Sequence, residues 1–303
     1  MKRIYLSQSS ILLLSAFLIL SCSNKKSNEI EEQSTLDTME VTLVSVKEEW
    51  IENRVKDAKA RLQVSSAGQK LWEAIEAHGT LNTWFENGPI SFHFDYQPLD
   101  DNLRRNTYQV VDKWSVRAVQ EMGENREVKF GWDGTNAWIY PDSVDLPINP
   151  RFWSITPYYF VGLPFVLADE GVILEELGKK EYNGITYDLI KASYEKGIGD
   201  APGDYYVIYI NPETNLMEGL RYIVSYPGFF PAGNHSPEKF MEILDTQVID
   251  GIIMPTGYKT YWFKENEPAE HITNIDVMEV SFVPGIENSY FDVPSGAKIQ
   301  KGY

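Results

Sequence analysis

Cysteine and histidine, the residues that most often bind metals or act as nucleophiles, are scarce in this chain. Cys22 is the only cysteine, and the 303 residues include 4 histidines. A single cysteine excludes an internal disulfide and a cysteine-based metal site. The histidines lie far apart, so no pair has the short spacing that a zinc site uses. The chain also lacks a P-loop, a nucleophile elbow and a dinucleotide-binding motif, so the sequence predicts no catalytic residue, no metal and no other cofactor.

Long apolar runs are also few. The run near the N-terminus, Ile11–Leu20, has ten residues, which is too short to span a bilayer. It follows two basic residues and precedes Ser21 and Cys22, so residues 1–21 are predicted to be a signal peptide. The four residues ILSC resemble the lipobox of bacterial lipoproteins, although Leu20 is larger than the usual residue there. We therefore expect lipid attachment at Cys22, and an ordinary signal peptide with an incidental cysteine is the alternative.

Positive charge is in deficit. The chain has 27 Lys and Arg against 44 Asp and Glu, a formal net charge of -17. Such an acidic protein repels nucleic acid and anionic lipid surfaces. We therefore expect no nucleic-acid partner, and attachment to a membrane through lipid on Cys22 and not through charge. Residues 22–42 are mostly polar and are predicted to form a flexible tether between this lipid and the folded part.

Two kinds of hydrophobic periodicity divide the rest of the chain. Apolar residues recur at spacings of three and four over Val44–Leu62, and again in a segment that Ser65 or Ser66 can cap and that ends near His78, so two helices are predicted. From Ile90 onward the pattern has a period of two, which predicts about ten or eleven strands with no βαβ alternation. The expected fold class is α+β, with a strongly curved antiparallel sheet, an incomplete β-barrel, wrapped around N-terminal and connecting helices.

Local signals suggest where strands begin and end. Tyr108–Val119 is predicted to be one strand. Asp133 and Gly134 mark a two-residue hairpin turn between two short strands. Pro141–Pro150 contains three prolines and is predicted to be a loop.

The segment Thr156–Gly171, here called the central segment, is the most apolar and aromatic part of the folded chain. Gly162 and Pro164 interrupt it, so it cannot be one continuous helix or strand. Strand-like segments lie on both sides of it. We therefore expect it to cross between the two halves of the curved sheet, with a bend at Gly162 and Pro164.

Several loops carry side chains that could have a function. Phe229 and Phe230 form an apolar loop tip, which either folds back on the core or touches a membrane or lipid. None of the acidic pairs in predicted loops has the spacing of a calcium loop. These pairs are Asp100 with Asp101, Asp142 with Asp145, and Asp200 with Asp204. Solvated turn acids are the simpler interpretation, while a glycosidase would need two such carboxylates brought together in a cleft.

Several short motifs resemble the LolA/LolB-like superfamily of outer-membrane lipoprotein-sorting factors, especially a lipidated branch of that group. They are Glu76–Gly79 at a helix end, the hairpin Trp132-Asp133-Gly134 to Trp138, Tyr159–Phe165, Leu177-Gly178 before Tyr182–Tyr187, and Tyr209–Thr214. The similarity runs in order from about Ala67 to Pro294, which places a single LolA/LolB-like domain at residues 43–303. This chain is longer than typical sorting factors, and its lipobox would make it membrane-attached instead of a soluble shuttle.

The resemblance implies an apolar cavity between sheet and helices that takes acyl chains, and it implies no catalytic residue. We expect six side chains to line this cavity, or else to form a dry core: Trp132, Trp138, Phe160, Leu163, Phe165 and Leu167. The expected function is non-enzymatic binding of a hydrophobic ligand, an acyl chain or a lipidated protein, by an outer-membrane lipoprotein of a Gram-negative bacterium that faces the periplasm. The alternatives are a scaffold or interaction lipoprotein of the cell envelope and a glycan-handling enzyme or binder.

Overall fold

The computed structural model describes residues 41–301. The predicted signal peptide, the lipidation site Cys22 and the tether up to residue 40 lie outside the described residues. The described part belongs to one compact unit that begins at Val41.

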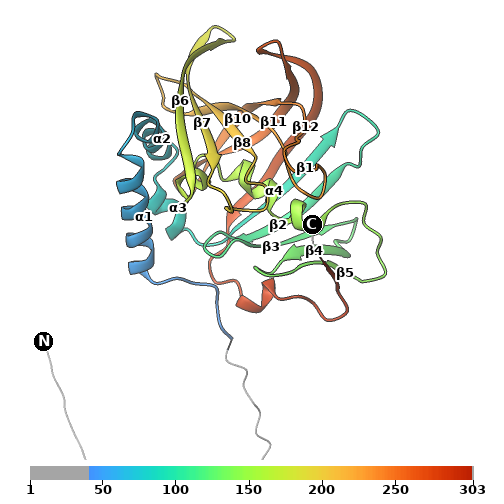
Figure 1. Ribbon diagram of the computed structural model, residues 1–303. Coiled ribbons are helices and arrows are strands. Elements are labelled where there is room, and N and C mark those ends of the chain that lie inside the picture. Colours follow the sequence, from blue (N-terminus) through green and yellow to red (C-terminus); the bar gives the residue numbers. More distant parts are fainter. Residues whose placement is uncertain (1–40, 302–303) are drawn as a thin grey trace, which may run out of the picture. The chain divides into compact units, whose positions relative to one another are not determined.

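One large antiparallel sheet dominates this unit (Figure 1). Its thirteen described strands run in the order β13-β5-β4-β3-β2-β1-β12-β11-β10-β9-β8-β7-β6. The strands are β1 Ile90–Pro98, β2 Arg105–Asp112, β3 Arg117–Met122, β4 Val128–Trp132, β5 Ala137–Tyr140, β6 Val172–Tyr182, β7 Ile185–Tyr194, β8 Tyr205–Ile210, β9 Met217–Tyr222, β10 Lys239–Ile249, β11 Ile252–Lys264, β12 Glu267–Phe282 and β13 Lys298–Gln300. The sheet curves strongly without closing into a barrel, because β13 and β6 at its two ends do not pair. The predicted α+β class with an incomplete barrel is confirmed.

The pairing of β1 with β12 joins the two halves of the sheet. The strands β1 to β5 form a meander in chain order, and β6 to β12 form a second one. The last long strand, β12, then returns beside β1, with Phe94 opposite Val277 and Tyr96 opposite Ile275. The chain between β5 and β6, residues 141–171, must therefore pass from one end of the sheet to the other. This agrees with the crossing expected of the central segment.

The prediction of one strand over Tyr108–Val119 is wrong. The structure has two strands there, β2 and β3, joined by a tight turn. The Asp112 carboxylate accepts hydrogen bonds from the backbone N–H groups of Trp114 and Ser115, at 3.0 and 3.4 Å, and Val116 has a φ of 56°. The apolar residues around the turn continue the alternating pattern, whereas the turn depends on side-chain hydrogen bonds that periodicity does not reveal.

The described residues contain four α-helices: α1 Glu48–Leu62, α2 Ser66–Ala77, α3 Leu81–Glu86 and α4 Pro150–Val161. The first two are the predicted ones, and the Ser65 side chain caps α2 by accepting from the Gly68 N–H at 3.1 Å. Connecting helices were expected as part of the fold, but no residue bounds were predicted for α3 or α4. Proline signals obscured α4, yet Pro150 occupies its first turn, where no N–H partner is needed, and Asn149 caps it. The helix ends at Gly162, where a bend was expected, and a 3₁₀ turn, η1 Phe165–Ala168, follows.

The core lies between the helices and the concave face of the sheet (Figure 1). Helix α2 packs on β6 and β7, and α4 packs on β3, β4 and β5. Two ion pairs join the first helices to the rest: Arg54 in α1 with Asp169 after η1, at 2.6 Å, and Lys70 in α2 with Asp188 in β7, at 2.8 Å. The helices therefore cover the open side of the half-barrel and hold the central segment against the sheet.

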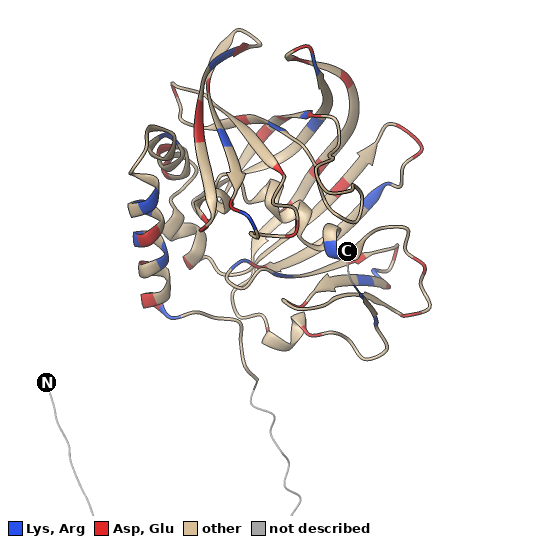
Figure 2. Ribbon diagram, in the orientation of Figure 1, with Lys and Arg blue, Asp and Glu red and all other residues tan. Residues whose placement is uncertain are grey.

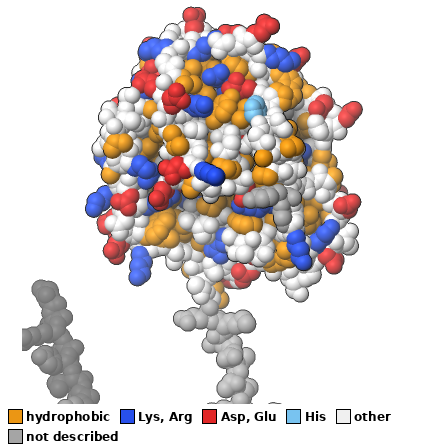
Figure 3. Space-filling view, in the orientation of Figure 1, with side chains coloured by type: hydrophobic (Ala, Val, Ile, Leu, Met, Phe, Trp, Pro, Cys, Tyr) orange, Lys and Arg blue, Asp and Glu red, His pale blue; other side chains and the backbone are white. Residues whose placement is uncertain are grey.

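Charged side chains of both signs are mixed over the surface. In Figure 2, acidic and basic residues alternate along α1, which has Glu48 and Glu49 in its first turn and Lys59 and Arg61 in its last, as the helix dipole favours. On the face in Figure 3, hydrophobic side chains lie between charged ones and no single sign of charge covers it. Within residues 41–301 no helix combines the length and apolar character needed to cross a membrane.

Candidate functional site

A cavity of about 190 Å³ lies between α4 and the strands β7, β8 and β9. Most of its lining is apolar or aromatic. The walls come from three parts of the chain: helix α4, the ends of β7 to β9, and the loop between β7 and β8. A cavity bounded by one helix and the inner face of a curved sheet is a common location for a small-molecule site.

The first wall is one side of α4, where Phe152, Ile155, Tyr159 and Phe160 line the cavity. Spacings of three and four relate Phe152, Ile155 and Tyr159, and Phe160 lies four residues after Thr156, which also lines the cavity, so one side of the helix faces it. The end of the helix is fastened to the sheet, because the Tyr258 hydroxyl of β11 donates to the Phe160 carbonyl at 3.0 Å. The helix wall therefore has a defined position relative to the strands.

The second wall is a group of tyrosines on adjacent strands. Tyr194 ends β7, Tyr206 lies in β8 and Tyr222 ends β9, and all three line the cavity. Tyr206 is directly opposite Tyr222 in the strand register, with ring centroids 6.3 Å apart. The Tyr222 ring also meets the Phe160 ring edge-on at 5.2 Å, which connects the two walls.

Four of the tyrosine hydroxyls in the lining are neutral donors that have no hydrogen-bond partner within residues 41–301. Burial raises the pKa of Tyr159 to about 12 and also raises the pKa of Tyr194, Tyr206 and Tyr222. None of the four hydroxyls forms a hydrogen bond with the described backbone or side chains. These hydroxyls can therefore form hydrogen bonds with a ligand without breaking any hydrogen bond within the protein.

The third wall is the loop before β8, which brings two carboxylates to the cavity. Asp200 forms an ion pair with Arg151 of α4, at 2.8 Å from Nε to Oδ2. Asp204 is half-buried, and its Oδ1 accepts from the Ser225 N–H at 2.5 Å. Burial raises the pKa of the Asp204 carboxyl. The interpretation of these two residues as solvated turn acids is therefore wrong for Asp204. Both acids come from one loop, so they do not occupy opposite walls as a glycosidase pair must.

Of the side chains predicted to line a cavity, the structure places Phe160 at this one. Leu163, Phe165 and Leu167 are buried in the core beside it. The Phe165 ring stacks on the Trp84 ring of α3, with centroids 4.7 Å apart and 4° between the planes. These three side chains pack the central segment into the core. The cavity is lined by residues that precede them in the chain, up to Phe160 of α4.

The two hairpin tryptophans lie apart from each other. Trp132, at the end of β4, stacks under the Arg151 guanidinium at 3.5 Å, next to the ion pair that borders the cavity. Trp138 in β5 is 1% exposed and belongs to a separate cluster with Val119 and Phe291. The structure thus brings Trp132 near the cavity and puts Trp138 in another part of the core.

The loop with Phe229 and Phe230 lies beside the cavity. The Phe229 ring is 47% exposed and packs at 5.0 Å from Phe152 and 5.2 Å from Tyr226, both of which line the cavity. Phe230 is partly buried. One apolar side chain therefore faces solvent immediately outside the aromatic lining.

Other sites are less suited to an apolar ligand. A larger hollow of about 580 Å³ lies between the ends of two hairpins, β6–β7 and β11–β12, and its lining includes Lys180, Glu181 and Glu267. Within residues 41–301 no group of three or more His, Cys, Asp and Glu side chains lies close enough together to hold a metal ion. The 190 Å³ cavity is therefore the candidate site.

No local pattern in the sequence indicates the tyrosine wall. Tyr194, Tyr206 and Tyr222 lie in separate strands and share no motif. The alternation of strand residues could have shown that only one of Tyr205 and Tyr206 faces inward. Only the register between β8 and β9 brings Tyr206 beside Tyr222.

Comparison with solved structures finds several that are similar to this chain at low sequence identity. A LolA superfamily protein from Nitrosomonas europaea has 10% identity and a TM-score of 0.49, covering 76% of this chain and 99% of that one. An outer-membrane lipoprotein-sorting protein domain from Vibrio parahaemolyticus has 12% identity and a TM-score of 0.43, covering 71% and 97%. A DUF1329 family protein from Desulfovibrio piger has 13% identity and a TM-score of 0.42, covering 80% and 97%. Similarity at this level assigns no ligand to the chain.

Comparison with sequence families gives a more direct result. No protein of curated function matches the chain. The model of one family, described as a family of unknown function, DUF6503, matches residues 92–268, which is more than half of the chain. This range extends from β1 to the start of β12 and includes α4 and all three walls of the cavity. The chain therefore belongs to the DUF6503 family.

Proposed function

We propose that this protein is a lipid-anchored, non-catalytic binder of a hydrophobic ligand, and that the cavity between α4 and β7–β9 is its binding site. The observation that carries the proposal is the cavity itself, which has an apolar lining beside neutral hydroxyls. Apolar ligand surface that leaves water for such a lining supplies the driving force. The hydroxyls and the loop carboxylates would orient the ligand.

The size of the cavity limits what it holds. A cavity of about 150 Å³ lined by apolar side chains accepts a benzene molecule. The 190 Å³ cavity of this protein is slightly larger, so it accommodates a ring or a short alkyl segment. Burying about six methylenes would contribute about 5 kcal/mol, at about 0.8 kcal/mol each. A full acyl chain or a lipidated protein would need α4 or the β7–β8 loop to move outward.

The proposal predicts that filling the cavity abolishes ligand binding. Ala201 lines the cavity from the loop before β8, so an indole introduced by Ala201→Trp would occupy most of the space. We expect the full chain carrying Cys22→Ser, which prevents acylation, to bind hexanol with a millimolar dissociation constant. The same protein with Ala201→Trp added should lose this binding. Isothermal titration calorimetry measures both.

The matched control for this experiment is Ala232→Trp, which adds the same side chain to an exposed turn outside the cavity. It should bind hexanol like the parent protein. If the parent protein takes up no hexanol and carries no co-purified lipid in native mass spectrometry, the binding function is wrong. That result would favour the envelope-scaffold alternative.

The membrane anchor is a separate part of the proposal, and it is supported by the lipobox-like residues Ile19–Cys22. Residues 1–21 would be removed, the new N-terminal Cys22 would be acylated, and residues 22–42 would tether the folded part to the outer membrane. Phe229 and Phe230 would then contact the lipid surface. Several acyl chains hold a protein stably at a membrane, whereas a single chain holds it weakly.

We expect intact-mass spectrometry of the protein from bacterial membranes to show loss of residues 1–21 and addition of acyl groups at Cys22. The Cys22→Ser chain should carry no acyl mass and should leave the outer-membrane fraction. A wild-type protein of unmodified mass in the soluble fraction would contradict lipid attachment.

A further inference from the structure

Aromatic rings face the cavity from both of its main walls. Tyr159 and Phe160 come from α4, and Tyr194, Tyr206 and Tyr222 come from three neighbouring strands. The face of an aromatic ring carries partial negative charge and attracts a cation within about 6 Å of its centre. A group of such rings around one space is the arrangement that recognises alkylated ammonium groups.

The charged residues of the lining leave one negative charge without a cationic partner. The lining contains Arg151, Asp200 and Asp204. The Arg151 guanidinium is used by Asp200, at 2.8 Å, and by the Trp132 ring. Asp204 takes part in no ion pair with the described residues, and its carboxylate is hydrogen-bonded by Ser225. The cavity therefore has aromatic rings in its lining together with a carboxylate that a bound cation would neutralise.

We propose that the cavity selects amphiphilic ligands that carry an ammonium group, with the ammonium between the tyrosine rings and the Asp204 carboxylate. This inference rests on the proposed function, since it specifies the chemical class of the ligand that the same cavity takes. The alkyl part of the ligand lies along Phe152 and Ile155 of α4. An amino lipid headgroup and a small alkylamine share the required chemistry.

A carboxylate ligand is disfavoured by the same groups. Its nearest cation, Arg151, is already paired with Asp200, and the Asp204 charge would repel it. The whole chain adds to this repulsion with its net charge of -17. Free fatty acids are thus the weakest of the simple amphiphiles expected to bind.

The selection should depend on pH through Asp204. The groups that face this carboxyl are the Tyr194 and Tyr206 hydroxyls from β7 and β8, the Ser225 N–H and His235. The Arg151–Asp200 pair borders the same cavity. The tyrosines remain neutral, because burial raises their pKa. Burial also raises the pKa of Asp204, so lowering the pH protonates it and removes the charge that attracts the ammonium. Affinity for an ammonium ligand should therefore fall as the pH falls, while affinity for an alcohol should stay constant.

The test compares three probes with the same six-carbon chain: hexyltrimethylammonium, hexanol and hexanoate. Calorimetric titration of the full chain carrying Cys22→Ser should give a dissociation constant at least about ten-fold lower for the ammonium than for hexanol, with hexanoate weakest. If none of the three binds, the proposed function itself fails. If hexanol or hexanoate binds as tightly as the ammonium, the cavity binds ligands but the inference about charge is wrong.

A second comparison uses Asp204→Asn, which removes the charge at constant size. We expect it to weaken hexyltrimethylammonium binding about five-fold or more and to affect hexanol binding much less, because an alcohol carries no charge. The control is Asp57→Asn on the exposed face of α1, which changes net charge equally and should affect neither ligand. An equal effect of both substitutions would overturn the role of Asp204. If Asp204→Asn does not fold, titrations of the protein with Asp204 intact at several pH values provide the test. An affinity for hexyltrimethylammonium that does not fall as the pH falls would then contradict the proposal.

Discussion

Replacing Trp84 by alanine is expected to lower the free energy of unfolding by about 3–5 kcal/mol, the usual cost of truncating a fully buried tryptophan. Trp84 in α3 is 1% exposed. Its ring stacks on Phe165 of the central segment at 4.7 Å and meets Phe282 of β12 edge-on at 6.0 Å. The indole thus joins a helix, the crossing segment and the strand that unites the two halves of the sheet.

Truncation of Trp84 also uncovers a buried amine. The Lys113 ammonium lies 4.4 Å from the Trp84 ring and donates to the Trp84 carbonyl, and burial lowers its pKa well below the usual value. Removing the ring leaves a cavity and takes away one favourable contact of a poorly solvated cation. Both effects lower the free energy of unfolding.

Urea denaturation followed by circular dichroism measures this loss, with Trp50→Ala as the matched control. Trp50 in α1 is 36% exposed and contacts Phe85 edge-on at 5.5 Å, so its truncation should cost about 1 kcal/mol. Equal losses of stability for the two substitutions would show that the Trp84 ring contributes no more to folding than the half-exposed Trp50 ring.

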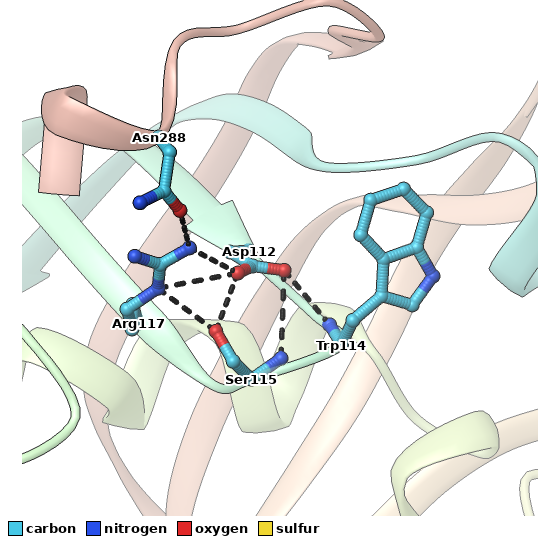
Figure 4. Close-up of polar contacts among 5 residues, drawn as sticks. All are labelled: Asp112, Trp114, Ser115, Arg117 and Asn288. Carbon is cyan, nitrogen blue, oxygen red and sulfur yellow. Dashed lines mark hydrogen bonds and ion pairs between the residues drawn. The ribbon is translucent and has the colours of Figure 1, made fainter. Parts of the chain in front are cut away.

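Replacing Asp112 by alanine is expected to cost a similar 3–5 kcal/mol, because it leaves a largely buried arginine without its partner. Asp112 is 2% exposed. Figure 4 shows its carboxylate between the Arg117 side chain and the turn residues Trp114 and Ser115. Its carboxylate pairs with Arg117 at 2.9 Å and accepts from the backbone N–H groups of Trp114 and Ser115. Arg117 in turn donates to Asn288 at 2.8 Å, so one carboxylate organises the β2–β3 turn and the C-terminal segment that packs on it.

Two variants separate the turn from the ion pair. Asp112→Asn keeps an oxygen for the Trp114 and Ser115 N–H groups and removes the charge. It should therefore recover part of the loss. The double substitution Asp112→Ala with Arg117→Met removes both charges and should be less destabilising than the sum of the single changes. Strictly additive losses in chemical denaturation would contradict the buried ion pair as the cause.

The β2–β3 turn also shows a limit of the sequence. Alternating apolar residues correctly predicted strand structure on both sides of Lys113–Val116, and the same alternation concealed the turn between them. The hairpin at Asp133 and Gly134 was predictable, since glycine tolerates the φ of +98° that its position requires. Its loop is longer than the two residues predicted, because Trp132 pairs with Ala137. The β2–β3 turn is instead stabilised by the Asp112 side chain, and an aspartate within an alternating pattern does not by itself indicate a turn.

The candidate site was predictable only in part. The apolar central segment indicated which region crosses the sheet, and Phe160 does line the cavity. The neighbouring Phe165 and Leu167 are equally apolar but pack against the core. Composition cannot separate these cases, because a cavity lining and a dry core use the same residue types.

The sequence by itself determined the α+β class, the strand-rich region after Ile90, the capped second helix and the bend at Gly162, because each depends on periodicity or on the conformational limits of single residues. Only the tertiary structure decided where the cavity lies and what surrounds it. Strand register places Tyr206 beside Tyr222, and the crossing of α4 brings Phe160 and Arg151 to the same space. Register and crossing depend on contacts between residues far apart in the chain, which no local pattern encodes.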